Sequence, residues 1–221
     1  MKLLHVNITG WTATFRLPLL YSGTGLTSPL PPYSTLLGLI GNVCGREVKP
    51  NETRLGYVFK GEGTAIDIET SHRLEMKNKI LKEQKQTAVA KRQFIIKPVL
   101  DLYLDNLEFK LWFDRPQNPP CLGRSQDIAW INDVEIIDAE PISEGFVRGT
   151  LLPFSESPVP GLVLLLPDYF DNSQTGFARE VGKLRTYVAV KHDAPVKISR
   201  ENLYRIENDG SGNIVYLNKL L

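Results

Sequence analysis

The residues that could bind an anionic ligand are concentrated in one segment of this sequence. Residues 72–97 hold eight Lys and Arg side chains against two Glu, a net charge of +6, which leaves −5 on the rest of a chain whose total is +1. Cations spaced along a segment suit a path of phosphates better than a code of bases. We therefore predict nucleic-acid contacts from Arg73, Lys77, Lys79, Lys82, Lys85, Lys91 and Arg92. The alternative is an ordinary solvated charged face.

A second candidate anion site is the start of a predicted helix after Pro31 and Pro32. The prolines hold the chain extended, and the hydroxyl of Ser34 or Thr35 can cap the first free N–H groups. An apolar face follows until Gly45 stops the helix. A helix N-terminus with neighbouring hydroxyls attracts phosphate. The alternative is a capped core helix without a ligand.

The elements that position these residues predict an α+β fold. The order strand, helix, strand, strand, short helical or turn segment, strand is that of a ferredoxin-like (RRM-like) domain, which we place at 1–143. Residues 72–93 are predicted to form an extended β-hairpin arm, with an amphipathic helix as the alternative, and 107–113 to form a strand. Short apolar runs between turn residues predict a small β-rich part at 144–221.

Several functional classes are not indicated. Cys44 and Cys121 have no metal-ligand spacing and suggest no disulfide framework, so neither a metal nor a cofactor is predicted. The sequence has no phosphate-binding or dinucleotide fingerprint. It also has no signal run at the N-terminus, and its longest apolar run, Leu162 to Leu166, is too short to span a bilayer. We expect a cytoplasmic protein with no membrane partner.

Three segments together resemble a known family. They are Ala13-Thr-Phe-Arg, Leu30-Pro-Pro-Tyr-Ser-Thr-Leu-Leu-Gly-Leu-Ile-Gly, and Leu122-Gly-Arg-Ser. The chain is similar in these segments to the CRISPR-associated Cas five family, from a superfamily of RNA-binding proteins with RRM-like domains. The resemblance covers most of residues 1–140, and its first helix is the most specific part.

The resemblance implies a non-catalytic subunit of a type I CRISPR Cascade complex, with type I-B as the expected subtype. Such a subunit holds the crRNA 5′ handle, caps the filament of backbone subunits and contacts the large subunit that reads the PAM in target DNA. A projecting hairpin called the thumb lies over the RNA, and residues 72–93 are its candidate here. The complex would serve antiviral defence or RNA-guided DNA targeting.

Reading a single-stranded handle requires base stacking and hydrogen bonds to base edges. Phe15, Arg16 and Tyr33 are the candidates for these contacts, and Gly123-Arg124-Ser125 offers a close backbone approach with one guanidinium. The alternatives are a core aromatic for Phe15 and a surface ion pair for Arg16.

Two other functions stay open. A metal-independent endoribonuclease that processes pre-crRNA needs a base, an acid and a cation, for which His72, Tyr33 and Lys97 are candidates. The pair Lys191-His192 lies far outside the part of the chain where the family would place such a pair. A purely architectural scaffold that recruits partners through its C-terminal part is the other alternative. We expect the RNA-binding subunit rather than an enzyme.

Overall fold

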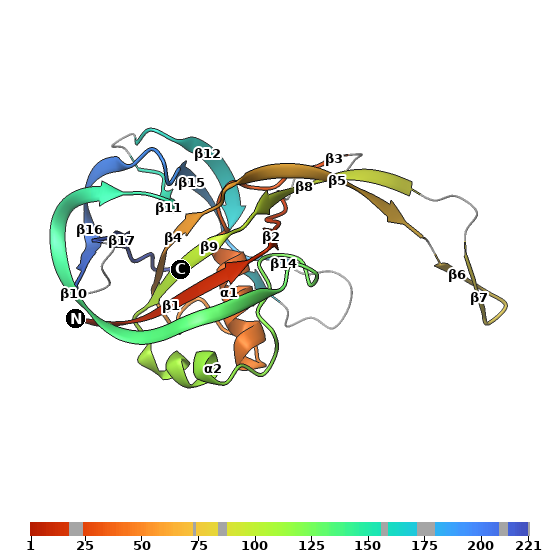
Figure 1. Ribbon diagram of the computed structural model, residues 1–221, viewed down its shortest axis with the longest axis horizontal. Coiled ribbons are helices and arrows are strands. Elements are labelled where there is room, and N and C mark those ends of the chain that lie inside the picture. Colours follow the sequence, from red (N-terminus) through yellow and green to blue (C-terminus); the bar gives the residue numbers. More distant parts are fainter. Residues whose placement is uncertain are drawn as a thin grey trace.

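A six-stranded antiparallel sheet, in the order β17-β16-β10-β1-β9-β4, forms the centre of the structure (Figure 1). This computed structural model describes residues 1–17, 24–72, 74–83, 88–155, 159–171, 180–207 and 212–220. The strands of the sheet are β1 (Lys2–Gly10), β4 (Leu55–Lys60), β9 (Val99–Leu104), β10 (Ala129–Val147), β16 (Val196–Ile206) and β17 (Ile214–Tyr216).

Strand β1 lies between β9 and β10 and is buried on both faces over much of its length. Leu4, Val6 and Ile8 alternate along it, and all three pack into the main hydrophobic core with their side chains on one face. On the opposite face, Leu3 joins a smaller core with residues of β16 and β17. The C-terminal strands therefore cover part of the face that the helices leave open.

Helix α1 (Tyr33–Cys44) packs on the first of these faces. It ends as predicted, because Gly45 adopts a left-handed φ of 68° and its N–H donates to the carbonyl of Asn42 at 3.2 Å. The capping prediction for Ser34 or Thr35 is wrong. The N-cap is Pro32, whose carbonyl accepts from two backbone N–H groups and which offers no side-chain acceptor.

Residues 107–113, predicted as a strand, are helical. They form the 3₁₀ turn η1 (Leu107–Phe109) and then helix α2 (Lys110–Asp114). The side chain of Asn106 accepts from the N–H of Glu108 at 3.0 Å, which caps the turn and starts the helix. The apolar residues Phe109 and Phe113, four apart, then reach the core on one face. The described chain is thus β-rich, with α1 and α2 as its short α-helices.

The C-terminal part continues the central sheet and adds a second one. The predicted boundary between residues 143 and 144 falls inside β10, at a register shift opposite β16, so one strand runs through both parts. The second sheet has the order β11-β15-β12, and Gly149 before it accepts from the N–H of Phe59 in β4 at 2.8 Å. The remaining C-terminal strands are β11 (Thr150–Pro153), β12 (Leu162–Pro167), β13 (Phe170–Asp171), β14 (Glu180–Val181) and β15 (Leu184–Val190).

Neither α-helix in the described ranges is long and apolar enough to cross a membrane.

Candidate nucleic-acid interface

A long pair of antiparallel strands projects from one end of the central sheet (Figure 1). Strand β5 (Gly63–Ser71) pairs with β8 (Ala88–Ile96) along its whole length, and β2 (Thr12–Ala13) and β3 (Thr24–Gly25) flank β8 near the base. Farther out, β6 (Leu74–Lys77) pairs with β7 (Ile80–Glu83). We call β5, β6, β7 and β8 the arm. The helical alternative is wrong for these residues, and the paired strands begin well before residue 72.

The turn at the far end of the arm presents a lysine. Asn78 and Lys79 have φ values of 51° and 64° between β6 and β7, the left-handed pair that suits a two-residue hairpin turn. Lys79 and Lys82 are exposed there, and Lys91 is exposed on β8. Lys77 ends β6, whereas Arg73 and Lys85 lie outside the described residues.

Strand β5 supplies acids that offset part of the basic charge. From Gly63 to Ile96 the sequence has seven Lys and Arg and four Asp and Glu, a net charge of +3. The Arg92 Nε donates to the Glu69 carboxylate, and Lys97 Nζ lies 3.0 Å from Glu62 Oε2 at the base. The count of +6 omitted these strand partners. The cations best placed for phosphate are therefore the exposed lysines farther out.

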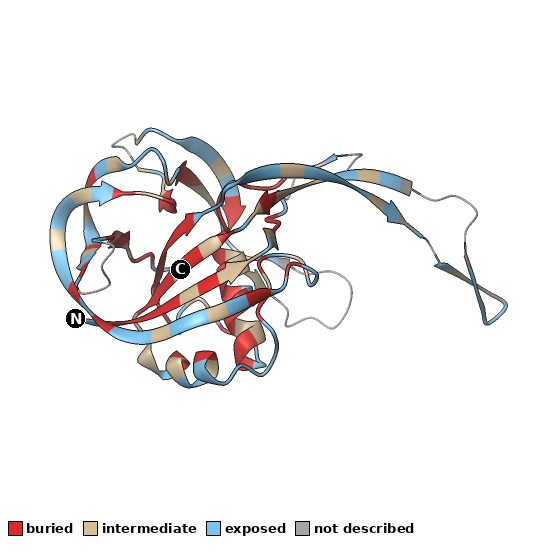
Figure 2. Ribbon diagram, in the orientation of Figure 1, coloured by how far each residue is buried: buried red, intermediate tan, exposed pale blue. Residues whose placement is uncertain are grey.

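The arm also carries an apolar face that the sequence analysis missed. Ile66, Ile68 and Val89 are 59%, 64% and 62% exposed, and the register of β5 and β8 places them on one face with Lys91. Leu74, Met76, Ile80 and Leu81 are also exposed toward the tip. Figure 2 shows β5 and the tip of the arm mostly exposed, whereas β8 is largely intermediate and becomes buried near its base. The alternation of apolar and polar residues in Ala65-Ile-Asp-Ile-Glu could have predicted this face. On a projecting strand, side chains that alternate in this way leave one apolar face in solvent.

A hollow of about 460 Å³ lies where the arm meets the loop before β10. Arg92 and Phe94 line it from β8, and Arg124 lines it from the loop. Three carboxylates share the hollow: Asp67, Glu69 and Asp127. Acids outnumber cations here, so this hollow suits a base edge or a ribose hydroxyl better than a phosphate.

Phe15 does not supply a stacking surface. Its side chain is 1% exposed and packs edge-to-face on Phe59 in the main core, with ring centroids 5.3 Å apart. A buried ring cannot stack on a base, so the core-aromatic alternative is correct. Its neighbour Arg16 is exposed and remains a candidate contact.

Tyr33 is also buried, at 1% exposure, and its hydroxyl donates to the carbonyl of Leu151 at 2.8 Å. Burial, together with nearby Tyr57 and Tyr187, raises the pKa of Tyr33 well above its ordinary value. The ring therefore serves the core rather than RNA. Ser34 and Thr35, both half-buried, remain candidates only through the exposed part of the helix start.

The Gly123 backbone approaches protein rather than ligand. Its φ is +109°, and a Cβ at this position would lie 1.8 Å from the carbonyl oxygen of Thr14, so only glycine fits. The Arg124 guanidinium donates to Asp127 at 3.0 and 3.1 Å, which offsets its charge. Ser125 is exposed on the same loop. This loop therefore packs against the backbone at Thr14, immediately after β2.

Asp127 links this loop to stability. Burial raises its pKa, but hydrogen bonds from Arg124 and Thr12 outweigh burial and hold the pKa below its ordinary value. A carboxyl with a depressed native pKa stabilises the fold above about pH 4 and loses that contribution as pH falls.

We expect Asp127→Asn to lower the free energy of unfolding by about 2 kcal/mol at pH 7 and by much less at pH 3. Urea unfolding at both values tests this, with the exposed Asp193→Asn as control; an equal loss at both values would contradict it.

The three candidate nuclease residues are not brought together. His72 is exposed between β5 and β6, Lys97 lies at the base of the arm after β8, and Tyr33 is enclosed in the core. Among the described residues, no group of three or more His, Cys, Asp or Glu is arranged to hold a metal ion.

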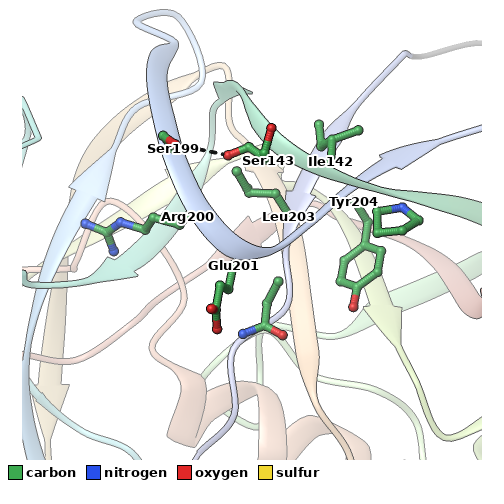
Figure 3. Close-up of a pocket in the computed structure, with 9 residues that line it drawn as sticks. Ile142, Ser143, Ser199, Arg200, Glu201, Leu203 and Tyr204 are labelled. Carbon is green, nitrogen blue, oxygen red and sulfur yellow. Dashed lines mark hydrogen bonds between the residues drawn. The ribbon is translucent and has the colours of Figure 1, made fainter.

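A further hollow, of about 570 Å³, arises from irregular pairing between β10 and β16 (Figure 3). Ser199 Oγ donates to the carbonyl of Ser143 at 3.2 Å, and the chain between Ser199 and Leu203 bulges outward. Arg200 points away from this contact and donates to Pro153 and Ser155. This hollow results from the bulge in β16, and we assign it no ligand.

No protein-family model and no curated protein matches this sequence. Solved structures do match its fold. A chain of a CRISPR RNA-guided surveillance complex matches with a TM-score of 0.57 at 18% identity, covering 89% of this chain and 91% of that one. A chain of the Type III-B Cmr-beta complex bound to cognate target RNA matches at 0.53 and 12% identity, covering 87% and 86%.

A CRISPR protein from Archaeoglobus fulgidus also matches, with a TM-score of 0.53 at 13% identity, over 97% of this chain and 98% of that one. At such identities the likeness concerns the fold, and it extends over nearly the whole chain, including the C-terminal part. The chain therefore shares the fold of proteins found in CRISPR RNA-guided complexes.

Proposed function

We propose that this chain is a non-catalytic crRNA-binding subunit of a type I CRISPR effector complex. In this role it holds the crRNA 5′ handle, caps the filament of backbone subunits and contacts the large subunit. The observation that carries the proposal is the arm, a projecting strand pair with exposed lysines and an exposed apolar face. Its support is the fold shared with chains of CRISPR complexes, two of which are described as RNA-guided or RNA-bound.

The order of the sheet supports a ferredoxin-like first part. Strands β1, β4, β9 and β10 have the spatial order β10-β1-β9-β4, with α1 after the first strand and α2 after the third. This is the βαββαβ arrangement, with a second helix of only five residues. We take the arm as an insertion between β4 and β9 of this unit, in the position proposed for the thumb.

The exposed lysines and the exposed apolar side chains of the arm bind different partners. Lys79 and Lys82 near the tip contact phosphates of the handle, and Lys91, which lies opposite Ile68, contacts phosphate where the RNA runs along the edge of the apolar face, so affinity falls as salt rises. The face formed by Ile66, Ile68 and Val89 packs on the neighbouring backbone subunit, because an apolar face of this kind is stabilised by burial in a partner.

The test is incubation of the purified protein with labelled repeat RNA in EDTA, assayed in parallel for binding and cleavage. We expect binding of the mature 5′ handle and no cut product, with a scrambled handle as control. A discrete cut inside the repeat that disappears in His72→Ala would instead establish a processing nuclease. Absence of RNA binding, with the fold intact, would contradict the proposal.

A further inference from the structure

A hydrogen-bonded polar network lies on the face of the central sheet opposite α1. Asp101 on β9 accepts from Asn7 Nδ2 at 2.7 Å and lies 3.1 Å from His5 Nε2. Asn132 Nδ2 donates to Asn7 Oδ1 at 2.8 Å and to Thr9 Oγ1 at 3.0 Å. Asn132 Oδ1 also accepts from the Thr9 hydroxyl at 3.3 Å, so the exposed Asn132 carbonyl keeps one lone pair that can accept from a ligand.

Two exposed tryptophans adjoin this network. Trp11 is 75% exposed and Trp130 is 48% exposed, and their ring centroids are 6.4 Å apart. Trp130 pairs with Thr9 across β1 and β10, so the Trp130 side chain lies on the same face as Thr9 and the network. Large aromatic rings in solvent beside oriented amides provide flat surfaces on which a ligand ring can stack.

A hollow of about 520 Å³ adjoins Thr9 on the other side. It is lined by the side chains of Lys60 and Lys97, with Glu62 and Val99. Lys60, Val99, Thr9 and Trp130 form one row across β4, β9, β1 and β10. Three strand spacings separate Lys60 from Trp130, about 14 Å. One row therefore offers a cation at one end and an aromatic ring at the other.

We propose that this row is a second contact site for single-stranded nucleic acid, with a base stacked on Trp130, an adjacent base edge hydrogen-bonded to Asn132, and a phosphate on Lys60. The combination of stacking ring, oriented amide and cation is what base recognition requires. A protein partner would use the rings alone and would leave the amides and Lys60 without a role. The site adjoins the base of the arm, so a strand bound to the arm can continue onto the sheet.

The inference rests on the proposed function only in taking the crRNA as the nearest source of single-stranded ligand. Displaced single-stranded DNA offers the same bases and phosphates. Parallel titrations with oligo-U RNA and with oligo-dT therefore distinguish the two sources. The strand that binds more tightly, with quenching that depends on Trp130, identifies the natural ligand of this site.

Intrinsic fluorescence tests the site directly, because the chain has three tryptophans. Trp112, half-buried in α2, provides the control. We expect the oligonucleotide to quench the emission of wild type and Trp112→Phe, whereas Trp130→Phe loses most of that quenching. Trp130→Ala should weaken binding about tenfold, the effect of one lost stacking contact. Circular dichroism checks that each variant is folded.

Anisotropy of a labelled oligonucleotide, measured on the same samples, separates two kinds of failure. If anisotropy shows binding, but Trp130→Phe is quenched as strongly as wild type, the site is overturned and the proposed function stands. No binding of either oligonucleotide overturns both. Quenching that depends on Trp130 but follows addition of a protein subunit, and not of an oligonucleotide, would assign the rings to a protein interface and overturn the inference.

Discussion

Reversing three exposed lysines of the arm, as Lys79→Glu, Lys82→Glu and Lys91→Glu together, is expected to weaken binding of the crRNA handle about 100-fold at 0.1 M salt. Each phosphate contact to a single strand contributes about 0.7 to the slope of log affinity against log salt. Losing three contacts lowers that slope by about 2, so the difference between variant and wild type should shrink toward 1 M salt. A salt series of anisotropy titrations measures both quantities.

The matched control reverses three lysines remote from the arm, Lys2, Lys197 and Lys219. Lys2 and Lys197 form only exposed pairs, with Asp138 and Glu144, and Lys219 is exposed near the C-terminus. This control changes the net charge equally, so it isolates the arm from the general field of the protein. Equal losses in both triple variants would mean that the arm is not the binding site. Unchanged affinity and slope in the arm variant would favour the architectural scaffold.

The sequence predicted those elements whose signals are local. The alternation of Leu4, Val6 and Ile8 placed β1, and Gly45 placed the end of α1, because each signal depends on nearest neighbours along the chain. The segment from Leu107 to Phe113 misled the prediction. Its apolar residues fit both period two and period four over so short a stretch, and the cap by Asn106 decided for helix.

The candidate site was harder to predict, because its character depends on pairing across the fold. The charge of 72–97 could be counted, but the acids that offset it lie on β5, which pairs with β8 only in the folded chain. The sequence offered Arg124 as an RNA contact, but in the fold its guanidinium donates to Asp127, which Thr12 also holds by a hydrogen bond. Phe15 and Tyr33 lie in the segments that resemble the family, and the structure gives both a packing role.

The row from Lys60 to Trp130 shows the same limit in the opposite direction. Its residues come from four strands, and none belongs to a motif in the sequence. Only the antiparallel register, with β1 between β9 and β10, places them side by side. A site whose residues come together only through strand pairing cannot be predicted from their order in the sequence.

The apolar face of the arm leads to the prediction for assembly. Replacing Ile66, Ile68 and Val89 by Ser is expected to weaken assembly with the backbone subunit at least about 100-fold, while RNA affinity of the isolated chain stays within about threefold. Each side chain is about 60% exposed, so its loss costs the fold little, whereas burying three of them in a partner contributes about 3 kcal/mol or more. Co-purification with the backbone subunit and crRNA, followed by titration of the purified components, measures the loss.

A matched control replaces three exposed apolar residues of β12, Leu162, Val163 and Leu165, by Ser. These side chains are 50–54% exposed on an edge strand of the second sheet, so the control removes similar apolar surface from a different place. We expect it to retain the backbone subunit. The arm variant should also be less prone to self-association than wild type in sedimentation experiments, because its exposed apolar face is removed. Normal assembly of the arm variant would show that this face is not the interface, and would leave RNA contacts as the only role of the arm.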